Sequence, residues 1–245
     1  MLRPSHTAVW LGSGAVLGLA GEVLYAGFRD LPRLEGTDAS GTFGHPELPP
    51  LRIAVLGDSS CTGPGLEDPD QIWVRRIGEH FGHRYHTIID SVAIGGSRAG
   101  DVLRDQVPMI LATKPDVALV AVGSNDMLYG VPVGTLEDNL DSIVTSLLTC
   151  TPAVLLSGVG DLGTIPRLPL ALTRIMRWRG GRADEAHTRV AARHPGVMRI
   201  PIRDRCGAAF EDPSIYAADL LHVNGEGHRL WAEAAIPSIE EALQG

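Results

Sequence analysis

Short apolar runs and amphipathic stretches alternate along residues 51–245, and this pattern predicts a parallel α/β fold. Five apolar runs indicate strands, at residues 53–56, 85–93, 117–122, 154–156 and 197–202. Apolar residues at helical spacing predict helices over 71–81 with Asp70 as N-cap, over 101–111, 136–148 and 183–194, and from a cap at Asn224 to residue 243. Strands that alternate with helices in this way form βαβ units. We therefore expect a five-stranded parallel sheet with helices on both faces and the run 117–122 at its centre.

The first fifty residues do not follow this alternation. Residues 8–28 are apolar or small except for Ser13 and Glu22, and arginines flank them on both sides. The stretch is just long enough to cross a bilayer, and its first part has the length of a signal-peptide core. We predict that residues 1–29 are a signal or membrane anchor, so that the protein is membrane-associated or exported. The alternatives are an amphipathic helix packed on the domain and a cytoplasmic location.

Residues 30–50 are rich in Pro, Gly, Ser and Thr and show no hydrophobic period. This composition is typical of a linker. The folded domain is therefore expected to cover residues 51–245.

A second irregular segment, residues 157–182, begins with prolines and leucines and continues with four arginines around Trp178. The strand before it ends at the same edge of the sheet as the strand that precedes Ser59. We expect the segment to form an apolar wall over that edge. Its arginines indicate a solvated helix face, with recognition of an anionic head group as the alternative.

Composition narrows the possible functions. With 245 residues, 44% hydrophobic and 20% charged, the chain has the composition of one globular domain with a sizeable core. A net charge of −8 without a basic stripe argues against nucleic acid as a partner. The 3 cysteines are far apart and form no C-x-x-C pair, which argues against a disulfide framework and a zinc site. His80, His83 and His86 straddle a helix end, a glycine turn and a strand start, so they are expected to be solvated or capping rather than metal ligands.

Polar, glycine-bearing turns follow the predicted strands, at the edge where open parallel sheets bind ligands. Ser59, Gly96 and Asn125 lie in three such turns. Asp219 and His222 lie three residues apart before the last helix, a spacing that lets the carboxylate hold one imidazole nitrogen while the other faces outward as a base. Ester hydrolysis by a serine also needs donors for the oxyanion, which the Asn125 amide and the backbone N–H groups of Gly96 and Ser59 can supply. These residues together favour nucleophilic catalysis.

Four short blocks resemble those of the SGNH (GDSL-type) esterase family, in particular a subgroup with an apolar N-terminus. The blocks are GDS at 57–59, a glycine turn at 95–96, GSND at 123–126 and DxxH at 219–222. The resemblance spans residues 51–243 and implies Ser59 as nucleophile, His222 as base and Asp219 as the carboxylate that orients it. It also implies an oxyanion hole made by Ser59, Gly96 and Asn125. The fold implied is a flavodoxin-like three-layer α/β/α sandwich, and neither a metal nor an organic cofactor is needed.

The function predicted from these residues is a serine esterase that acts on lipid-like or short-chain acyl esters through an acyl-enzyme. Its partner is a small-molecule or lipid ester. Gly95 is the neighbouring alternative to Gly96, and His228 is a rival base that we expect at the surface. An acyltransferase built on the same triad is an alternative function. A second alternative is a non-catalytic flavodoxin-like module that binds phosphate or flavin in the loop 59–63.

Overall fold

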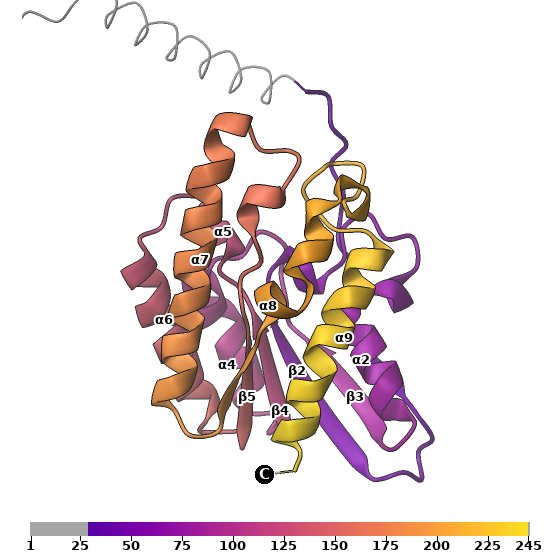
Figure 1. The fold of residues 1–245 in the computed structure, drawn as a ribbon. Coiled ribbons are helices and arrows are strands. Elements are labelled where there is room, and N and C mark those ends of the chain that lie inside the picture. Colours follow the sequence, from indigo (N-terminus) through magenta and orange to yellow (C-terminus); the bar gives the residue numbers. More distant parts are fainter. Residues whose placement is uncertain (1–28, 245) are drawn as a thin grey trace, which may run out of the picture.

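A six-stranded sheet forms the centre of the computed structural model, which describes residues 29–244 (Figure 1). Its strands are β1 (Gly41–Phe43), β2 (Pro50–Gly57), β3 (His86–Ser91), β4 (Val117–Ala121), β5 (Ala153–Ser157) and β6 (Val197–Ile200). They lie in the order β1-β3-β2-β4-β5-β6. The five strands from β3 to β6 pair in parallel, as predicted, and β4 is the middle one of these five. Every residue of β4 and β5 is buried, since helices cover both faces of the sheet.

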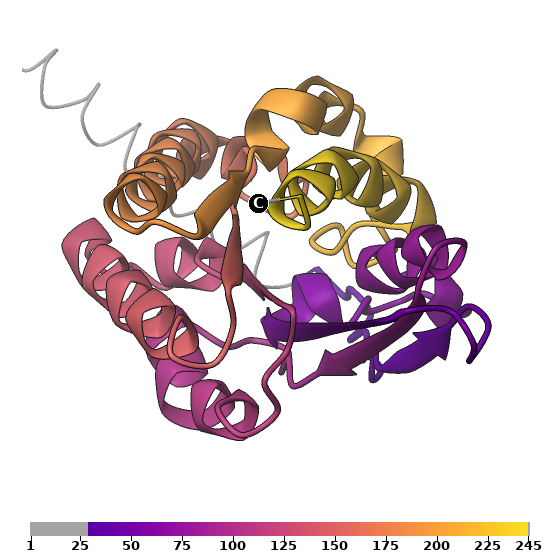
Figure 2. The ribbon, with the colours of Figure 1, turned by 90° about the horizontal axis from the view of Figure 1, so that it is seen from below.

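The helices complete the expected three-layer α/β/α sandwich (Figure 2). On one face, α2 (Trp73–Gly82) packs beside α9 (Gly225–Ala242), and on the other lie α4 (Val107–Ile110), α6 (Val133–Leu147) and α7 (Leu170–Arg193). The shorter helices are α3 (Ala99–Asp101), α5 (Ser124–Leu128) and α8 (Ile202–Cys206), with 3₁₀ turns η1 (Ser59–Cys61), η2 (Pro69–Gln71), η4 (Leu162–Thr164), η5 (Gly207–Glu211) and η6 (Pro213–Ile215) and a π-helical segment η3 (Val102–Gln106). The predicted cap of α9 is confirmed, because the Asn224 side chain accepts hydrogen bonds from the N–H groups of Glu226 and Gly227.

The sixth strand, β1, lies in the segment 30–50 for which the sequence predicts a linker. It pairs antiparallel with β3, and next to it the Ser40 hydroxyl accepts a hydrogen bond from the Ser91 N–H at 3.0 Å. Ala39 is completely buried. The expectation of a linker without regular structure is therefore wrong for these residues. A strand of three residues, held through its backbone, leaves no hydrophobic period in the sequence.

The apolar segment expected to be a signal or membrane anchor, residues 8–28, lies outside the described residues. Between residues 29 and 244, no helix is long and apolar enough to cross a membrane. The described chain reaches β1 through a segment that binds the domain, since the Thr37 N–H donates to the Thr62 carbonyl at 2.8 Å.

Two helices differ from the prediction: one begins later than expected, and the other is interrupted. α2 begins at Trp73, and the residues before it form the separate turn η2, whose cap is the Asp68 side chain. Asp70 is therefore not the N-cap of the helix; it pairs with Arg75 at 2.7 Å. The helix predicted over 101–111 is divided into α3, the π-helical segment and α4, because one extra residue is accommodated in its middle.

α7 is much longer than predicted: it has 24 residues, whereas the sequence indicated a helix only over 183–194. Its first half carries a glycine pair and the arginines around Trp178, which interrupt the apolar period. The turn η4 packs on this half, and a Cβ on Gly180 would lie 3.1 Å from Leu162 Cγ. Packing, rather than amphipathicity, thus defines the start of this helix. Three of its arginines bond to neighbouring groups instead of facing solvent alone: Arg177, Arg179 and Arg182.

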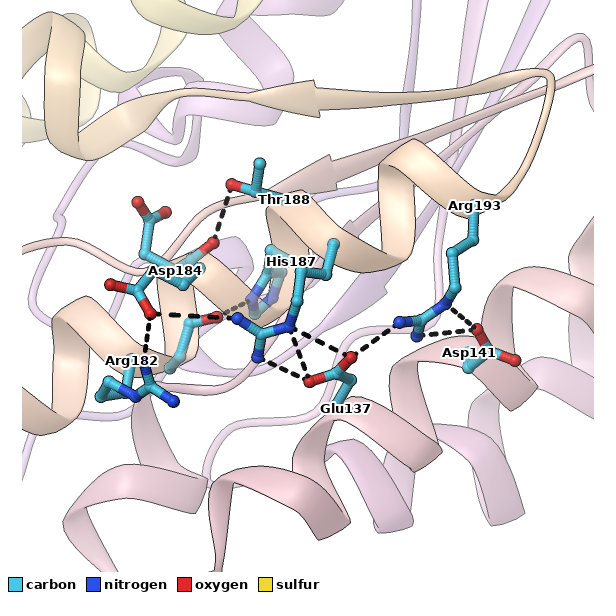
Figure 3. A network of polar contacts seen from close by, with 10 residues as sticks. Glu137, Asp141, Arg182, Asp184, His187, Thr188 and Arg193 are labelled. Carbon is cyan, nitrogen blue, oxygen red and sulfur yellow. Dashed lines mark hydrogen bonds and ion pairs between the residues drawn. The ribbon is translucent and has the colours of Figure 1, made fainter.

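A network of charged side chains joins α6 to α7 at the surface (Figure 3). Glu137 on α6 lies between two arginines of α7, at 2.6 Å from Arg189 and 2.7 Å from Arg193. Arg193 also pairs with Asp141 at 3.0 Å. Hydrogen bonds from Arg189 and Arg193 lower the pKa of Glu137 to about 2. Exposed ion pairs contribute roughly 0–1 kcal/mol each, so this network orients α7 on α6 more than it stabilises the fold.

Candidate active site

The end of β2 holds Ser59 at the carboxyl edge of the sheet. Gly57, the last residue of the strand, has φ +156°, and a Cβ there would lie 2.2 Å from the Ala121 carbonyl oxygen. Only glycine lets the chain pass β4 so closely before it turns. The Asp58 side chain then accepts the Ser60 N–H at 2.9 Å and caps the turn η1, of which Ser59 is the first residue. Backbone and cap together fix the direction of the serine side chain.

Three predicted site residues form a hydrogen-bonded chain. His222 Nε2 lies 3.1 Å from Ser59 Oγ, and His222 Nδ1 lies 2.6 Å from Asp219 Oδ2. The carboxylate accepts the Nδ1 proton, which leaves Nε2 as the acceptor for the serine hydroxyl. This is the arrangement of a nucleophile, a base and a carboxylate that orients the base. The tertiary structure thus brings together residues 163 positions apart.

The surroundings of Asp219 keep its carboxyl group ionised. The residue is 2% exposed, and its Oδ1 accepts the backbone N–H groups of Leu221 at 3.1 Å and His222 at 3.0 Å. Burial by itself would raise the pKa of this group, but the hydrogen bonds outweigh burial and hold the pKa below its ordinary value. Leu220, within the same turn, has φ +59°, the left-handed conformation that residues with a Cβ rarely adopt. The turn is therefore built to direct two N–H groups at one carboxylate oxygen.

Backbone N–H groups in the turn η1 and in the glycine turn are candidate donors for a substrate oxygen at Ser59. Among residues 29–244, no acceptor pairs with the backbone N–H of Ser59, Gly95 or Gly96. Gly96 has φ +83° in a tight turn closed by the Ser97 N–H, as the third residue of a type II turn requires. A Cβ on Gly95 would lie 3.8 Å from Ser59 Cβ, so the glycine turn contacts the serine. Asn125, in the first turn of α5, donates from Nδ2 to the Ser97 carbonyl at 3.1 Å.

Comparison with known proteins assigns the chain to a family. The sequence pattern of the GDSL-like lipase/acylhydrolase family matches residues 55–230. This chain belongs to that family. The predicted SGNH (GDSL-type) hydrolase is thus confirmed, and with it the prediction of a carboxylic-ester hydrolase.

Relatives of this GDSL-type hydrolase include two bacterial esterases. GDSL-like esterase Rv1075c of Mycobacterium tuberculosis is 25% identical over 234 residues, which cover 90% of this chain and 73% of that protein. Esterase TesA of Pseudomonas aeruginosa is 32% identical over 111 residues, which cover 44% of this chain and 53% of that protein.

Solved structures share its fold. A crystal structure of TesA superposes with a TM-score of 0.65 at 22% identity, covering 78% of this chain and 99% of that one. Axe2, an acetylxylan esterase from Geobacillus stearothermophilus, superposes with a TM-score of 0.65 at 16% identity, covering 77% of this chain and 94% of that one.

A buried carboxyl group that the sequence analysis did not single out adjoins the site of this GDSL-type hydrolase. Asp58 is 4% exposed, and burial raises its pKa to about 6. Its Oδ2 lies 3.5 Å from Asn125 Nδ2, while its Oδ1 holds the Ser60 N–H. The aspartate next to the serine thus shapes the turn η1 and restrains the asparagine amide.

Gln106 is a second residue that sequence reasoning missed. It is completely buried in the π-helical segment, accepts the Gly57 N–H at 2.8 Å and donates to the Gly57 carbonyl at 2.9 Å and to Ser97 Oγ at 3.1 Å. It therefore ties the end of β2 to the glycine turn. π-Helical segments recur at functional sites. The sequence signal is the position of Gln106, four residues after Val102 and four before Ile110, which places a polar residue on the apolar side of the predicted helix.

A cavity of about 890 Å³ opens at Ser59 and His222. Its volume lies within the range of roughly 300–1,000 Å³ that is usual for small-molecule sites. The expected apolar wall is present, since Leu162 and Ile165 line the cavity. Leu34, from the segment predicted to be a linker, also contributes. Further apolar residues that face the cavity are Ile94, Met109, Leu128, Ile202, Phe210 and Trp231.

His228 is not at the surface, where the sequence analysis placed it. It is 1% exposed, lines the cavity and lies edge-on to Trp231 with ring centroids 5.2 Å apart. Its Nδ1 accepts the Trp73 N–H at 3.3 Å. Because His222, and not His228, is hydrogen-bonded to Ser59, the geometry favours His222 as the base.

Proposed function

We propose that this hydrolase is a serine esterase that cleaves acyl esters through a covalent acyl-enzyme on Ser59. The observation that carries the proposal is the hydrogen-bonded chain from Ser59 through His222 to Asp219, whose first two members line the cavity. His222 Nε2 takes the hydroxyl proton as Ser59 Oγ attacks the ester carbonyl, and then gives it to the departing alkoxide. A water molecule activated by the same nitrogen releases the acid and restores the serine.

Asp219 has two tasks in this scheme. It fixes the His222 tautomer that accepts a proton at Nε2, and its negative charge stabilises the imidazolium that forms during attack. The hydrogen bonds that lower its pKa keep it charged in the working range of the enzyme.

The N–H groups of Ser59 and Gly96 and the Asn125 amide are the donors for the developing oxyanion. Asn125 Nδ2 keeps its bond to the Ser97 carbonyl and exchanges its long 3.5 Å contact with Asp58 for the substrate oxygen. Both N–H groups lack acceptors among the described residues, so they are available to a substrate oxygen without breaking an existing bond. Removal of one such donor typically costs about 2.7–4 kcal/mol of transition-state stabilisation.

The mostly apolar cavity supports lipid-like or short-chain acyl esters as the substrate class. Esters of graded acyl length, tested on the purified enzyme, define the preferred length. Product analysis with added glycerol separates hydrolysis from acyl transfer, since a transferase would yield the glycerol ester.

The decisive test is labelling by a fluorophosphonate probe. We expect the wild-type protein to be labelled and to hydrolyse esters, and both Ser59→Ala and His222→Ala to lose nearly all turnover, because the members of such a triad act as a unit. Equal labelling of Ser59→Ala would refute the nucleophile. Full activity of His222→Ala together with an inactive His228→Ala would move the base to His228.

The apolar segment 8–28 supports membrane association or export of the full chain. We expect full-length protein to sediment with membranes and protein that starts at Arg29 to remain in the supernatant. The deletion ends there because residues from Leu34 onward line the cavity. Full-length protein that stays in the supernatant without detergent contradicts this part of the proposal.

A further inference from the structure

His228 carries a hydrogen-bond donor that the fold leaves unused. A backbone N–H can only donate, so the hydrogen bond from the Trp73 N–H requires His228 Nδ1 to be unprotonated and places the ring proton on Nε2. Burial lowers the pKa of His228 to about 3, so the ring is neutral at the pH at which enzymes work. The residue is therefore a fixed neutral donor.

This donor faces the cavity without a partner. Among residues 29–244, no hydrogen bond uses His228 Nε2, although the residue is 1% exposed and lines the same cavity as Ser59 and His222. Nε2 itself is not sealed from solvent, so the open space of the cavity reaches it. An oxygen atom of a bound ligand can therefore accept its proton without breaking a bond between described residues.

Aromatic side chains line the cavity beside His228, beginning with Trp231. Phe210 and Trp231 stack with ring centroids 5.8 Å apart, and Tyr216 meets Phe210 edge-on. The Tyr216 hydroxyl is already paired with Thr164 Oγ1 at 2.7 Å. A substrate that enters this region thus meets aromatic surface and the N–H of His228.

We propose that His228 is a specificity-determining residue, which donates from Nε2 to a second oxygen atom of the substrate, separate from the ester group that reacts. The preferred substrates are accordingly esters with an ether, hydroxyl or further carbonyl oxygen a few bonds from the scissile bond, rather than esters of plain alkyl chains. This inference rests on the proposed esterase function. The oxygen can belong to the acyl chain or to the alcohol, and the test has an arm for each.

The test compares matched pairs of esters on the full-length enzyme. In the first arm, para-nitrophenyl esters of one chain length carry an ether oxygen in place of a methylene at successive distal positions of the acyl chain. In the second arm, the oxygen is moved along the alcohol of butyrate esters, and release of butyrate is titrated. At one position we expect kcat/KM of the oxygen-bearing ester to exceed that of its methylene partner roughly three- to tenfold, as for a hydrogen bond between neutral groups.

Variants of His228 separate recognition from folding. His228→Phe should bring this ratio to about one or below, whereas His228→Gln, which keeps an acceptor for Trp73 and a donor, should retain part of it. The ratio is measured for two substrates on one preparation, so a loss of folded enzyme cancels. His80→Phe, a change at a half-exposed residue of α2 that does not line the cavity, is the control and should keep the wild-type ratio.

Two outcomes overturn the inference: a wild-type enzyme without preference for oxygen at any position in either arm, or an unchanged ratio in His228→Phe. Failure of the proposed function gives a different result, since neither member of a pair would then be hydrolysed or Ser59→Ala would hydrolyse both.

Discussion

Replacement of Asp219 by asparagine removes the negative charge of this residue while nearly preserving its size and shape. In the wild-type protein, one carboxylate oxygen accepts the N–H groups of Leu221 and His222, and the other accepts the imidazole proton at 2.6 Å. Asparagine has the same shape, but it has only one oxygen for these three donors.

The number of hydrogen bonds decides how the amide is oriented. With its oxygen toward the two backbone N–H groups, both of those bonds survive, and the NH₂ group faces His222 Nδ1. The opposite orientation saves one bond, loses two and sets the NH₂ group against two further donors. At about 0.5–1.5 kcal/mol for each net hydrogen bond, and more for a buried donor left unpaired, the first orientation is favoured.

That orientation places His222 in the wrong tautomer. Nδ1 must accept from the amide, so the ring proton moves to Nε2, which then cannot accept the proton of Ser59. In the chymotrypsin-type triad the same exchange lowers kcat about 10⁴-fold. We expect a comparable loss for Asp219→Asn, and a melting temperature close to that of the wild type, because the backbone bonds of the turn persist.

The assay is ester hydrolysis at saturating substrate, together with the rate of labelling by a fluorophosphonate and a thermal melt. A variant that melts like the wild type and retains more than about one-tenth of its kcat would refute the reasoning, since Asp219 would then not control the tautomer. Asp219→Ala serves as the comparison: it leaves two buried N–H groups without an acceptor and should also lower the melting temperature.

Three further predictions follow from the neighbours of Ser59. Asn125→Ala should lower kcat about 10²–10³-fold in steady-state kinetics, the usual effect of losing an oxyanion donor, and an unchanged kcat would remove Asn125 from the oxyanion hole. Gly96→Ala should destabilise the protein by about 1–2 kcal/mol in denaturant titrations and slow labelling, because φ is +83°, whereas Gly95→Ala adds only an ordinary contact at 3.8 Å and should do neither. The pKa of Asp58 is raised from 3.8 to about 6, so the native state binds more protons than the unfolded chain in this interval and the free energy of unfolding should fall by about 3 kcal/mol as pH rises through it. Denaturant titrations at several pH values should show this fall in the wild type and not in Asp58→Asn.

The sequence by itself predicted most of the sheet, and it singled out the three residues that the structure joins in one hydrogen-bonded chain, Ser59, His222 and Asp219. Strands such as 117–122 are continuous apolar runs because helices cover both of their faces, so the apolar run alone predicts a buried strand. The turns that follow these strands contain Ser59 and Asn125, and the pairing of Asp219 with His222 is local, since three residues separate them. Features that depend on residues close together in the chain can be predicted from the sequence alone.

The sequence did not predict features that depend on contacts across the molecule. β1 is held by backbone pairing with β3 and by a serine hydroxyl, so it has no hydrophobic signature. The first half of α7 is helical because η4 packs on it, although its glycines and arginines disfavour the assignment. Both errors arise where tertiary packing outweighs local preference.

In the candidate active site too, some residues were found from the sequence and others only from the tertiary structure. The residue types and their order along the chain were enough to propose Ser59, Asp219 and His222 as a catalytic set, and the structure joins these three side chains by hydrogen bonds. The tertiary structure alone decided that Gln106 ties Gly57 to the glycine turn and that His228 is buried beside the cavity with one donor unused. Those roles arise because distant segments pack together and bury particular polar atoms away from water. No local pattern of residues predicts which atoms will be buried.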